Sequence, residues 1–242
     1  MSKKTTSTIL ALLLMLGLQL FAQQKQLAID DLMNRKLFPA SLINLQWRSN
    51  TLFTWNAGNS ILQNNVKTTA TDTILSLDQL NLIIEESQQK KLRNLPMIRW
   101  ENETTFRYTN DAKVFRFNMP TRQLALVNSY ETDAENTDME PITGRIAFTR
   151  ENNLYVSENG KTTAVTSDTD KGIVNGKTVH RNEFGIDGGT FWSPKGNLLA
   201  FYRMDETMVT QYPLVDINQR IAQVEYIRYP MAGMASHHVT VG

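Results

Sequence analysis

The sequence of 242 residues contains no cysteine. This absence excludes a disulfide framework and a cysteine-ligated metal, but it says little about compartment, because many exported proteins lack disulfides. An excess of one charge is also missing, since 25 Lys and Arg residues stand against 24 Asp and Glu residues. We therefore expect neither a nucleic acid nor an anionic membrane surface as a partner.

An apolar run long enough for a comfortable transmembrane helix is missing too. The run at residues 9–21 falls short of the required length, which is about 20 apolar residues. Lys3 and Lys4 precede this run and Ala22 follows it, an order typical of a secretory signal peptide. An uncleaved anchor helix is the alternative, whereas a lipoprotein is excluded because no cysteine can carry the lipid. We expect residues 1–22 to be a signal peptide and residues 23–242 to be exported, to the periplasm or beyond the cell.

Short predicted strands separated by turns make up most of the sequence after Pro39. They fall into four units, at residues 42–77, 97–127, 144–165 and 190–229. The fourth unit includes predicted strands at residues 208–216 and 224–229.

An aromatic residue recurs on one predicted strand of each unit. Trp47, Trp100, Phe148 and Trp192 follow one another at intervals of 44 to 53 residues. A propeller blade of four strands takes roughly 40–50 residues. The repeat therefore favours a β-propeller, with a generic β-sandwich as the alternative. We expect the three tryptophans to pack between blades rather than to bind a ligand.

Three segments depart from the strand pattern. Residues 27–38 suit a short helix, and residues 78–93 suit a short helix or an excursion between blades. Residues 130–140 are acidic and rich in turn formers, so we expect a loop there. Their carboxylates lack the D-x-[DN]-x-[DN]-G order of a calcium loop, so we expect no metal.

The most informative stretch lies between residues 179 and 212. It contains the turn W-S-P-K-G at residues 192–196, between a short aromatic strand and an apolar strand. Proline presets φ at the first corner of such a turn, and glycine supplies a positive φ later. The stretch therefore predicts a β-hairpin of the kind found in propeller blades. Taken alone, the motif indicates no more than a good hairpin turn.

The residues around this turn add a family resemblance. The stretch begins VHRNEFGIDGGTFWSPKGNLLAFYRMDE and is followed by YPL and IRYPMAG. In these motifs it resembles the propeller of the dipeptidyl peptidase IV family of serine exopeptidases. More narrowly, it resembles the bacterial exported members, which cut after proline near a substrate's N-terminus. The resemblance runs from about residue 27 to the last residue and is densest over residues 179–233.

This resemblance implies an all-β fold in the form of a partial β-propeller. The family builds eight blades, and the four units account for about half of them. Half a propeller leaves sheet edges open, and residues 239–242 look like the start of another strand. We therefore expect an N-terminal fragment, or a truncated product, of a longer protein.

The resemblance also implies that the bond-breaking chemistry lies elsewhere. The family's catalytic α/β-hydrolase domain follows the propeller and carries its nucleophile in G-x-S-x-G. The only glycines four apart are the pairs Gly172/Gly176 and Gly185/Gly189, and neither pair encloses a serine. We expect no catalytic residue, no metal and no cofactor in this chain, and no peptidase activity from it alone.

Substrate capture is the role that the resemblance assigns to this chain. In the family, an acidic residue on a short propeller segment pairs with the free ammonium group of the substrate, and Glu183 matches that position. Well-known members carry two adjacent glutamates, whereas Asn182 precedes Glu183 here, so the second ligand is missing or is the amide of Asn182. Whether the product is a dipeptide or a tripeptide therefore stays open. The alternative is that Glu183 forms an ordinary loop ion pair with Arg181 or Arg203.

A second family element is an arginine on an early blade that binds substrate carbonyl oxygens. The guanidinium suits this task because its donors are fixed in a fork. Arg107, between Phe106 and Tyr108, occupies a similar place. The alternative is a strand arginine that faces solvent.

Two functional hypotheses follow. In the first, the chain is the propeller portion of an exported, prolyl-specific serine peptidase. Its partners are then a peptide with a free N-terminus and the C-terminal α/β-hydrolase domain of the full-length protein, and a homodimer is left open. In the second, the chain is a non-catalytic binding or scaffold propeller, or a truncated remnant. A hydrolase domain in the same reading frame would separate the two.

Overall fold

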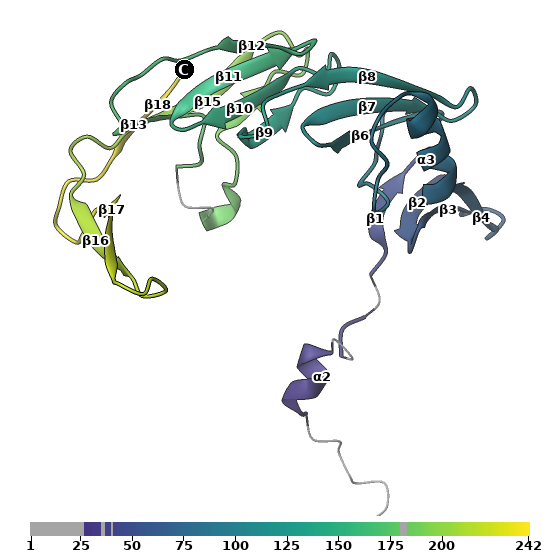
Figure 1. The fold of residues 1–242 in the computed structure, drawn as a ribbon, viewed down its shortest axis with the longest axis horizontal. Coiled ribbons are helices and arrows are strands. Elements are labelled where there is room, and N and C mark those ends of the chain that lie inside the picture. The colour runs from purple at the N-terminus through teal and green to yellow at the C-terminus, as the bar shows by residue number, and fades with distance from the viewer. Residues whose placement is uncertain (1–26, 35–36, 40, 180–182) are drawn as a thin grey trace, which may run out of the picture. The chain divides into compact units, whose positions relative to one another are not determined.

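The computed structural model describes residues 27–34, 37–39, 41–179 and 183–242 (Figure 1). The chain divides into two units, Met1–Leu42 and Ile43–Gly242. The described part of the first unit contains the short helix α2 (Ile29–Met33), which confirms a helix within residues 27–38. The expected signal peptide lies outside the described residues. In the described part of the chain, no helix has the length and apolar character needed to cross a membrane.

Two four-stranded antiparallel sheets open the second unit, each with its strands in chain order (Figure 1). Sheet A consists of β1 (Ile43–Trp47), β2 (Leu52–Ala57), β3 (Ser60–Asn65) and β4 (Thr71–Ser76). Sheet B consists of β5 (Arg99–Trp100), β6 (Thr105–Asn110), β7 (Lys113–Asn118) and β8 (Gln123–Ser129). Both sheets coincide with predicted units and have the strand order of a propeller blade.

The third sheet contains one strand that the sequence did not predict. Sheet C consists of β9 (Glu135–Met139), β10 (Ile146–Arg150), β11 (Asn153–Glu158) and β12 (Lys161–Ala164). The expected loop at residues 130–140 is therefore wrong in part, because β9 lies within it and pairs with β10. The residues of β9 are exposed or half-buried, so the segment lacks the apolar alternation by which a strand is predicted.

The fourth sheet also departs from the prediction. Sheet D is built around β15 (Leu199–Asp205), which pairs with β13 (Ile173–Asn175), β14 (Thr190–Trp192) and β18 (His238–Val241). The expectation that residues 208–216 and 224–229 belong to this sheet is wrong. They contain β16 (Gln211–Asp216) and β17 (Gln223–Arg228), which form a two-stranded sheet of their own. Most residues of this hairpin are exposed, so burial does not fix it against sheet D.

An apolar core fills the space between sheets A and B. Helix α3 (Leu77–Glu86) closes it, which confirms the helical alternative for this segment. Ser76 and Gln79 form a capping box at the start of the helix, with bonds of 3.2 and 3.0 Å. The buried residues of this core are Ile61, Leu75, Leu77, Leu80, Ile83, Ile84, Leu92, Ile98, Phe106, Tyr108, Phe115 and Phe117.

Polar side chains join neighbouring sheets as well. Asn128 on β8 is only 3% exposed. Its amide nitrogen donates to the carbonyl oxygens of Gly144 and Ser157, each at 2.9 Å. Ser157 lies on β11, so this one side chain links sheet B to sheet C. A buried amide in such a position is costly unless its donors are satisfied, and here they are.

Two tryptophan side chains also join neighbouring sheets by hydrogen bonds. Trp100 Nε1 donates to Thr54 Oγ1 on sheet A at 2.8 Å, and Trp192 Nε1 donates to the carbonyl oxygen of Asp138 on sheet C at 3.2 Å. Packing of these two indoles between blades is therefore confirmed. The same expectation is wrong for Trp47, which is 64% exposed on β1 at the edge of sheet A.

The predicted hairpin between β14 and β15 forms, and its glycine approaches sheet C closely. Gly196 N donates to the carbonyl oxygen of Ser193 at 2.8 Å. The φ angle of Gly196 is +68°, and a Cβ atom added there would lie 2.6 Å from the carboxyl carbon of Glu140. Arg145 donates to the carbonyl oxygen of the same glycine. The turn is therefore a joint between sheets C and D.

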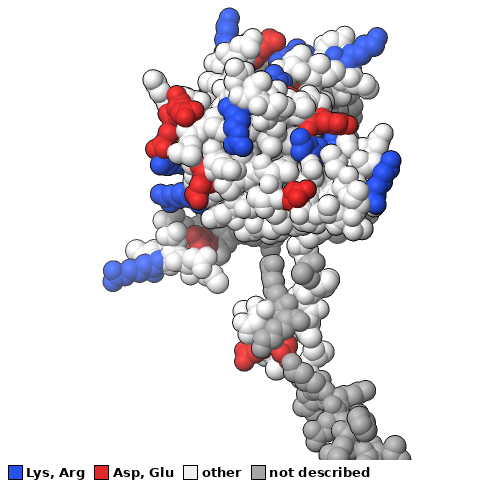
Figure 2. All heavy atoms as spheres, turned by 90° about the vertical axis from the view of Figure 1, so that its right-hand side faces the viewer, with Lys and Arg blue, Asp and Glu red and all other residues white. Residues whose placement is uncertain are grey.

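Charged side chains of both signs cover the surface. On the face of residues 43–242 that Figure 2 shows, Lys and Arg side chains are interspersed with Asp and Glu side chains. No large area of one sign is visible on this face.

Gly196→Ala should lower the free energy of unfolding more than Gly58→Ala. Both glycines have positive φ, but the space around Gly58 is open for 4 Å whereas Gly196 touches Glu140. The backbone penalty of about 1–2 kcal/mol is common to both variants, so their difference isolates the contact with Glu140. Urea denaturation of the two variants measures it. Equal destabilisation would show that the turn does not depend on the close approach.

Residues 23–242 expressed alone should self-associate. The edge strand β1 exposes Ile43, Leu45 and Trp47 by 58%, 54% and 64%, and apolar edge strands recruit other chains. Sedimentation velocity should detect oligomers, and Leu45→Lys should reduce them because a charged edge resists pairing. A monodisperse monomer of the unmodified chain would contradict the prediction.

Candidate functional site

The segment that carries Glu183 leaves and rejoins sheet D at one place. β13 pairs with residues 203–205 of β15 and β14 with residues 199–201. Because β18 and Gly242 occupy the other edge over residues 201–205, β13 and β14 follow one another along one edge of β15. Asn175 at the end of β13 pairs with Arg203, and Thr190 at the start of β14 pairs with Phe201. Only Tyr202 of β15 lies between these partners. Residues 176–189 therefore form an excursion inserted into one interrupted strand, of which residues 176–179 and 183–189 are described.

Tyr202 holds both ends of the excursion with its backbone. Gly176 N donates to the carbonyl oxygen of Tyr202 at 2.8 Å, and Tyr202 N donates to the carbonyl oxygen of Gly189 at 2.9 Å. Further along, Thr178 Oγ1 donates to the carbonyl oxygen of Ile186 at 2.7 Å. The outgoing and returning arms are thus tied together twice. We call these five residues the neck of the excursion.

Glycine is required where the two arms touch. A Cβ atom added to Gly189 would lie 2.4 Å from the carbonyl oxygen of Gly176 and 2.4 Å from the carbonyl carbon of Lys177. Gly176 itself has a φ of +70°. Backbone meets backbone here, so no rotation of a side chain can make room.

Beyond the neck, the excursion forms the short 3-10 helix η1 (Glu183–Gly185). The backbone of Glu183 is described as part of η1, and Asn182 lies outside the described residues. Phe184 has a left-handed backbone, with φ 57° and ψ 20°, and is 87% exposed. An aromatic residue with positive φ is uncommon in proteins and marks a place where function is worth testing.

A cavity of about 580 Å³ lies between the returning arm and sheet C. Its lining includes Gly185, Ile186 and Asp187 from the arm and Asp138 from β9. Thr190 Oγ1 donates to Asp138 Oδ2 at 2.9 Å, which fixes that carboxylate. Its described lining residues include two aspartates and neither lysine nor arginine, so this part of the lining favours a cationic group.

A second cavity, of about 610 Å³, shares Asn136 and Thr178 with the first. Its lining also includes Lys177 from the outgoing arm, and Lys177 Nζ lies 3.1 Å from Glu135 Oε2 on β9. The excursion is therefore bordered by hollows and tied to sheet C.

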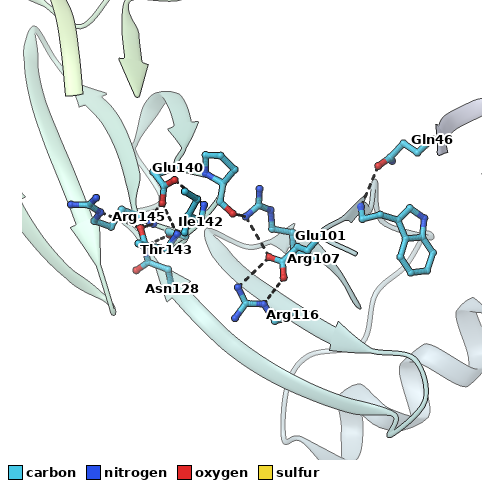
Figure 3. A network of polar contacts seen from close by, with 12 residues as sticks. Gln46, Glu101, Arg107, Arg116, Asn128, Glu140, Ile142, Thr143 and Arg145 are labelled. Carbon is cyan, nitrogen blue, oxygen red and sulfur yellow. Dashed lines mark hydrogen bonds and ion pairs between the residues drawn. The ribbon is translucent and has the colours of Figure 1, made fainter. Parts of the chain in front are cut away.

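Arg107 lies on β6 and is only 3% exposed, so the alternative of a solvent-facing arginine is wrong. Its Nη1 donates to the carbonyl oxygen of Pro141 at 3.1 Å and lies 3.4 Å from Glu101 Oε1 (Figure 3). Glu101 is held more tightly by Arg116, at 2.7 and 3.2 Å. Arg107 therefore connects sheet B with the turn that follows β9.

Burial lowers the pKa of Arg107, and the charge of Glu101 acts in the opposite direction. Among the described residues, Arg107 Nε has no hydrogen-bond partner. A buried guanidinium donor without an acceptor is costly, so this arginine retains capacity to bind a further oxygen.

Glu140 is a buried acid that the sequence did not single out. It is fully buried and accepts hydrogen bonds from Ile142 N at 2.8 Å and from Thr143 Oγ1 at 2.6 Å (Figure 3). Burial acts to raise its pKa, but the bonds from Thr143 and Ile142 and the charge of Arg145 outweigh burial, and the pKa is lowered. This carboxylate supports the turn of sheet D rather than a ligand.

Of the predicted site residues, the structure describes the side chain of Arg107 alone. Arg107 lines neither cavity. Arg203, the alternative partner of Glu183, lies 3.4 Å from Asp168. Within the described ranges, no cluster of three or more His, Asp or Glu residues is arranged to hold a metal.

The sequence did not single out Thr178 and Gly189, which belong to the excursion, or Asp138, which lines the cavity beside it, as residues of this site. The glycines of G-I-D-G-G were a signal for a tight backbone, but nothing in the sequence indicates the partners of Thr178 or Asp138, which lie across space.

Comparison with known proteins finds a family match and relatives whose names assign them to dipeptidyl peptidases. Residues 91–242 match the family described as dipeptidyl peptidase IV (DPP IV) N-terminal region. The Talaromyces stipitatus protein named "Probable dipeptidyl-aminopeptidase B" is 33% identical over 118 residues, which are 42% of this chain and 13% of that protein. The Aspergillus fumigatus protein named "Probable dipeptidyl peptidase 4" is 26% identical over 226 residues, which are 86% of this chain and 29% of that protein.

Two solved structures share the fold. A Bacteroides ovatus protein whose name assigns it to dipeptidyl aminopeptidase IV is 43% identical, with a TM-score of 0.74, over 84% of this chain and 28% of that one. Porphyromonas gingivalis dipeptidyl peptidase 4 is 18% identical, with a TM-score of 0.60, over 90% of this chain and 33% of that one. The chain therefore spans about a third or less of each relative.

Glu140→Gln should destabilise the chain most at neutral pH. The pKa of Glu140 lies below its ordinary value of 4.5, so its stabilisation is complete above that pH and is lost as pH falls through the lowered pKa. The difference in unfolding free energy between wild type and variant, from urea denaturation, should shrink between about pH 7 and pH 3. The exposed Glu86→Gln serves as control and should show no such change. A difference that is independent of pH would contradict the prediction.

Proposed function

Because the chain belongs to the family of dipeptidyl peptidase IV N-terminal regions, we propose that it is the propeller portion of an exported serine exopeptidase. The whole enzyme cuts peptides after proline near their N-terminus and releases dipeptides or tripeptides. Its Ser-Asp-His triad belongs to an α/β-hydrolase domain outside these residues. The propeller admits the peptide and holds its free N-terminus.

The observation that carries the proposal is the excursion at residues 176–189. A short segment tied at its base and projecting from a rigid sheet can present a side chain to a ligand without burying it in the blade. The motif that resembles the family's capture segment lies on this excursion. The neighbouring cavity, which Asp138 and Asp187 line, adds negative charge close to where an ammonium group would be held.

Glu183 is the residue to which we assign the ammonium contact. A carboxylate at a fixed distance from the hydrolase centre lets an exopeptidase count residues from the free N-terminus. The pair of ammonium and carboxylate contributes most when it is shielded from water, and loss of one partner then costs about 2–5 kcal/mol. Asn182 precedes it and offers an amide as a second, weaker acceptor.

Arg107 has a more limited part in this proposal. Its Nη1 is engaged with Pro141 and Glu101, so a bond to a substrate carbonyl would use donors that these contacts leave, Nε among them. The burial of its side chain supports first a role in holding sheets B and C together.

Glu183→Gln in the full-length enzyme should reduce kcat/KM for peptides with a free N-terminus by about 30-fold or more, the equivalent of about 2 kcal/mol or more. Peptides with an acetylated N-terminus should be affected little, because they have no ammonium group to hold. Glu86→Gln is the control, since it removes an exposed carboxylate on α3, outside the excursion, and it should leave kcat/KM unchanged on both classes of peptide. Steady-state kinetics on both classes of peptide give the ratio of kcat/KM for free peptides to kcat/KM for acetylated peptides.

An equal loss on free and acetylated peptides would remove Glu183 from the anchoring role. Absence of peptidase activity from the native full-length protein, with no G-x-S-x-G in its sequence, would instead favour a scaffold propeller.

A further inference from the structure

The excursion is attached to sheet D at a single register position, which poses a mechanical problem. Asn175 and Thr190 pair with Arg203 and Phe201, and both ends of the excursion bind the backbone of Tyr202 between them. One such attachment is a hinge, because two arms that meet at one residue can swing together about that point. A segment that measures distance has to be prevented from swinging.

The second tie of the neck restricts this freedom, together with the ion pair between Lys177 and Glu135 of sheet C. Thr178 Oγ1 donates to the carbonyl oxygen of Ile186 at 2.7 Å, beyond the attachment at Tyr202. Both residues are half-buried, so water competes with this bond less than it would at the surface. The bonds to Tyr202 and the bond between Thr178 and Ile186 lie at different distances from sheet D. Together they fix the direction in which the excursion projects as well as the place where it leaves the sheet.

The contact between the arms at Gly189 sets their spacing. Gly189 is buried, and its Cα packs directly on the backbone of Gly176 and Lys177. Gly188, the preceding residue, has no such constraint, since an added Cβ atom would come no closer than 3.9 Å to its neighbours. The close approach is therefore specific to one glycine of the pair.

We propose that Thr178 and Gly189 are positioning residues that fix the reach of the Glu183 segment and thereby the number of residues released from the substrate. This inference rests on the proposed function. Neither residue contacts the ammonium group. Thr178 acts through the carbonyl oxygen of Ile186, and Gly189 acts by letting the two arms touch. Without the second tie the anchoring carboxylate has a wider range of positions, so binding of the free N-terminus is weaker and the site of cleavage less uniform.

The test compares Thr178→Val with Thr178→Ser in the full-length enzyme. Valine has the shape of threonine but no hydroxyl, whereas serine keeps the donor. The readouts are the ratio of kcat/KM for free and acetylated peptides, and the products, by mass spectrometry, from peptides with proline at the second or third position. Thr178→Val should lower the ratio about fivefold, as expected for one net hydrogen bond, and should mix dipeptide and tripeptide products. Thr178→Ser should keep both close to wild type.

Gly189→Ala and Gly188→Ala form an independent pair. Gly189→Ala should lower the same ratio and mix the products, while Gly188→Ala should leave both unchanged. Thermal unfolding of each variant shows whether the fold is retained. If Gly189→Ala fails to fold, the comparison of Thr178→Val with Thr178→Ser still tests the positioning role.

Three outcomes would overturn the inference. In the first, Thr178→Val keeps the wild-type ratio and products while Glu183→Gln lowers the ratio, so the proposed function stands and the positioning role fails. In the second, Thr178→Val reduces activity equally on free and acetylated peptides, which indicates a merely structural effect. In the third, Glu183→Gln leaves the ratio unchanged, and the proposed function fails together with the inference.

Discussion

The backbone of Tyr202 is the constraint on which the candidate site depends. Its N–H and carbonyl groups hold Gly189 and Gly176, so an excursion of the chain occupies one register position of an otherwise continuous edge. Because β13 and β14 remain aligned on β15, the blade loses almost none of its ladder to accommodate the segment. Sheet D can therefore stay rigid while the excursion projects from it, which is the combination that a binding segment on a scaffold needs.

That rigidity depends in turn on contacts between sheets, since a four-stranded sheet cannot bury both of its faces alone. Sheets A and B share an apolar core with α3. Between the later sheets, buried polar groups contribute more visibly. Asn128 satisfies backbone groups across the boundary of sheets B and C, and Glu140 supports the hairpin turn at Gly196. These contacts are specific as well as stabilising. The buried polar atoms of Asn128 and Glu140 meet their hydrogen-bond partners at only one relative position of the sheets.

Arg107 illustrates how a residue can be singled out from the sequence while its surroundings stay unknown. Its position in the sequence suggested a substrate contact or a place in solvent, and the structure buries it between Glu101 and Pro141. Pro141 is far away in sequence, so no local pattern could indicate this bond. The strand β9 was missed for a related reason. Its acidic residues pair with β10 through the backbone, and backbone pairing leaves no mark on side-chain composition when the strand is not buried.

By itself, the sequence determined the all-β character, the first two blades with their strand order, the helix α3 and the W-S-P-K-G hairpin. All of these follow from local periodicity, capping and turn chemistry, which act over a few residues. Its motif also singled out Glu183, whose role stays a prediction. Only the tertiary structure decided that β16 and β17 form a sheet of their own, that β18 completes sheet D, and that Thr178 and Gly189 close the neck of the excursion. Those features depend on which segments meet in space, and pairing between distant segments is decided by the whole fold rather than by either segment alone.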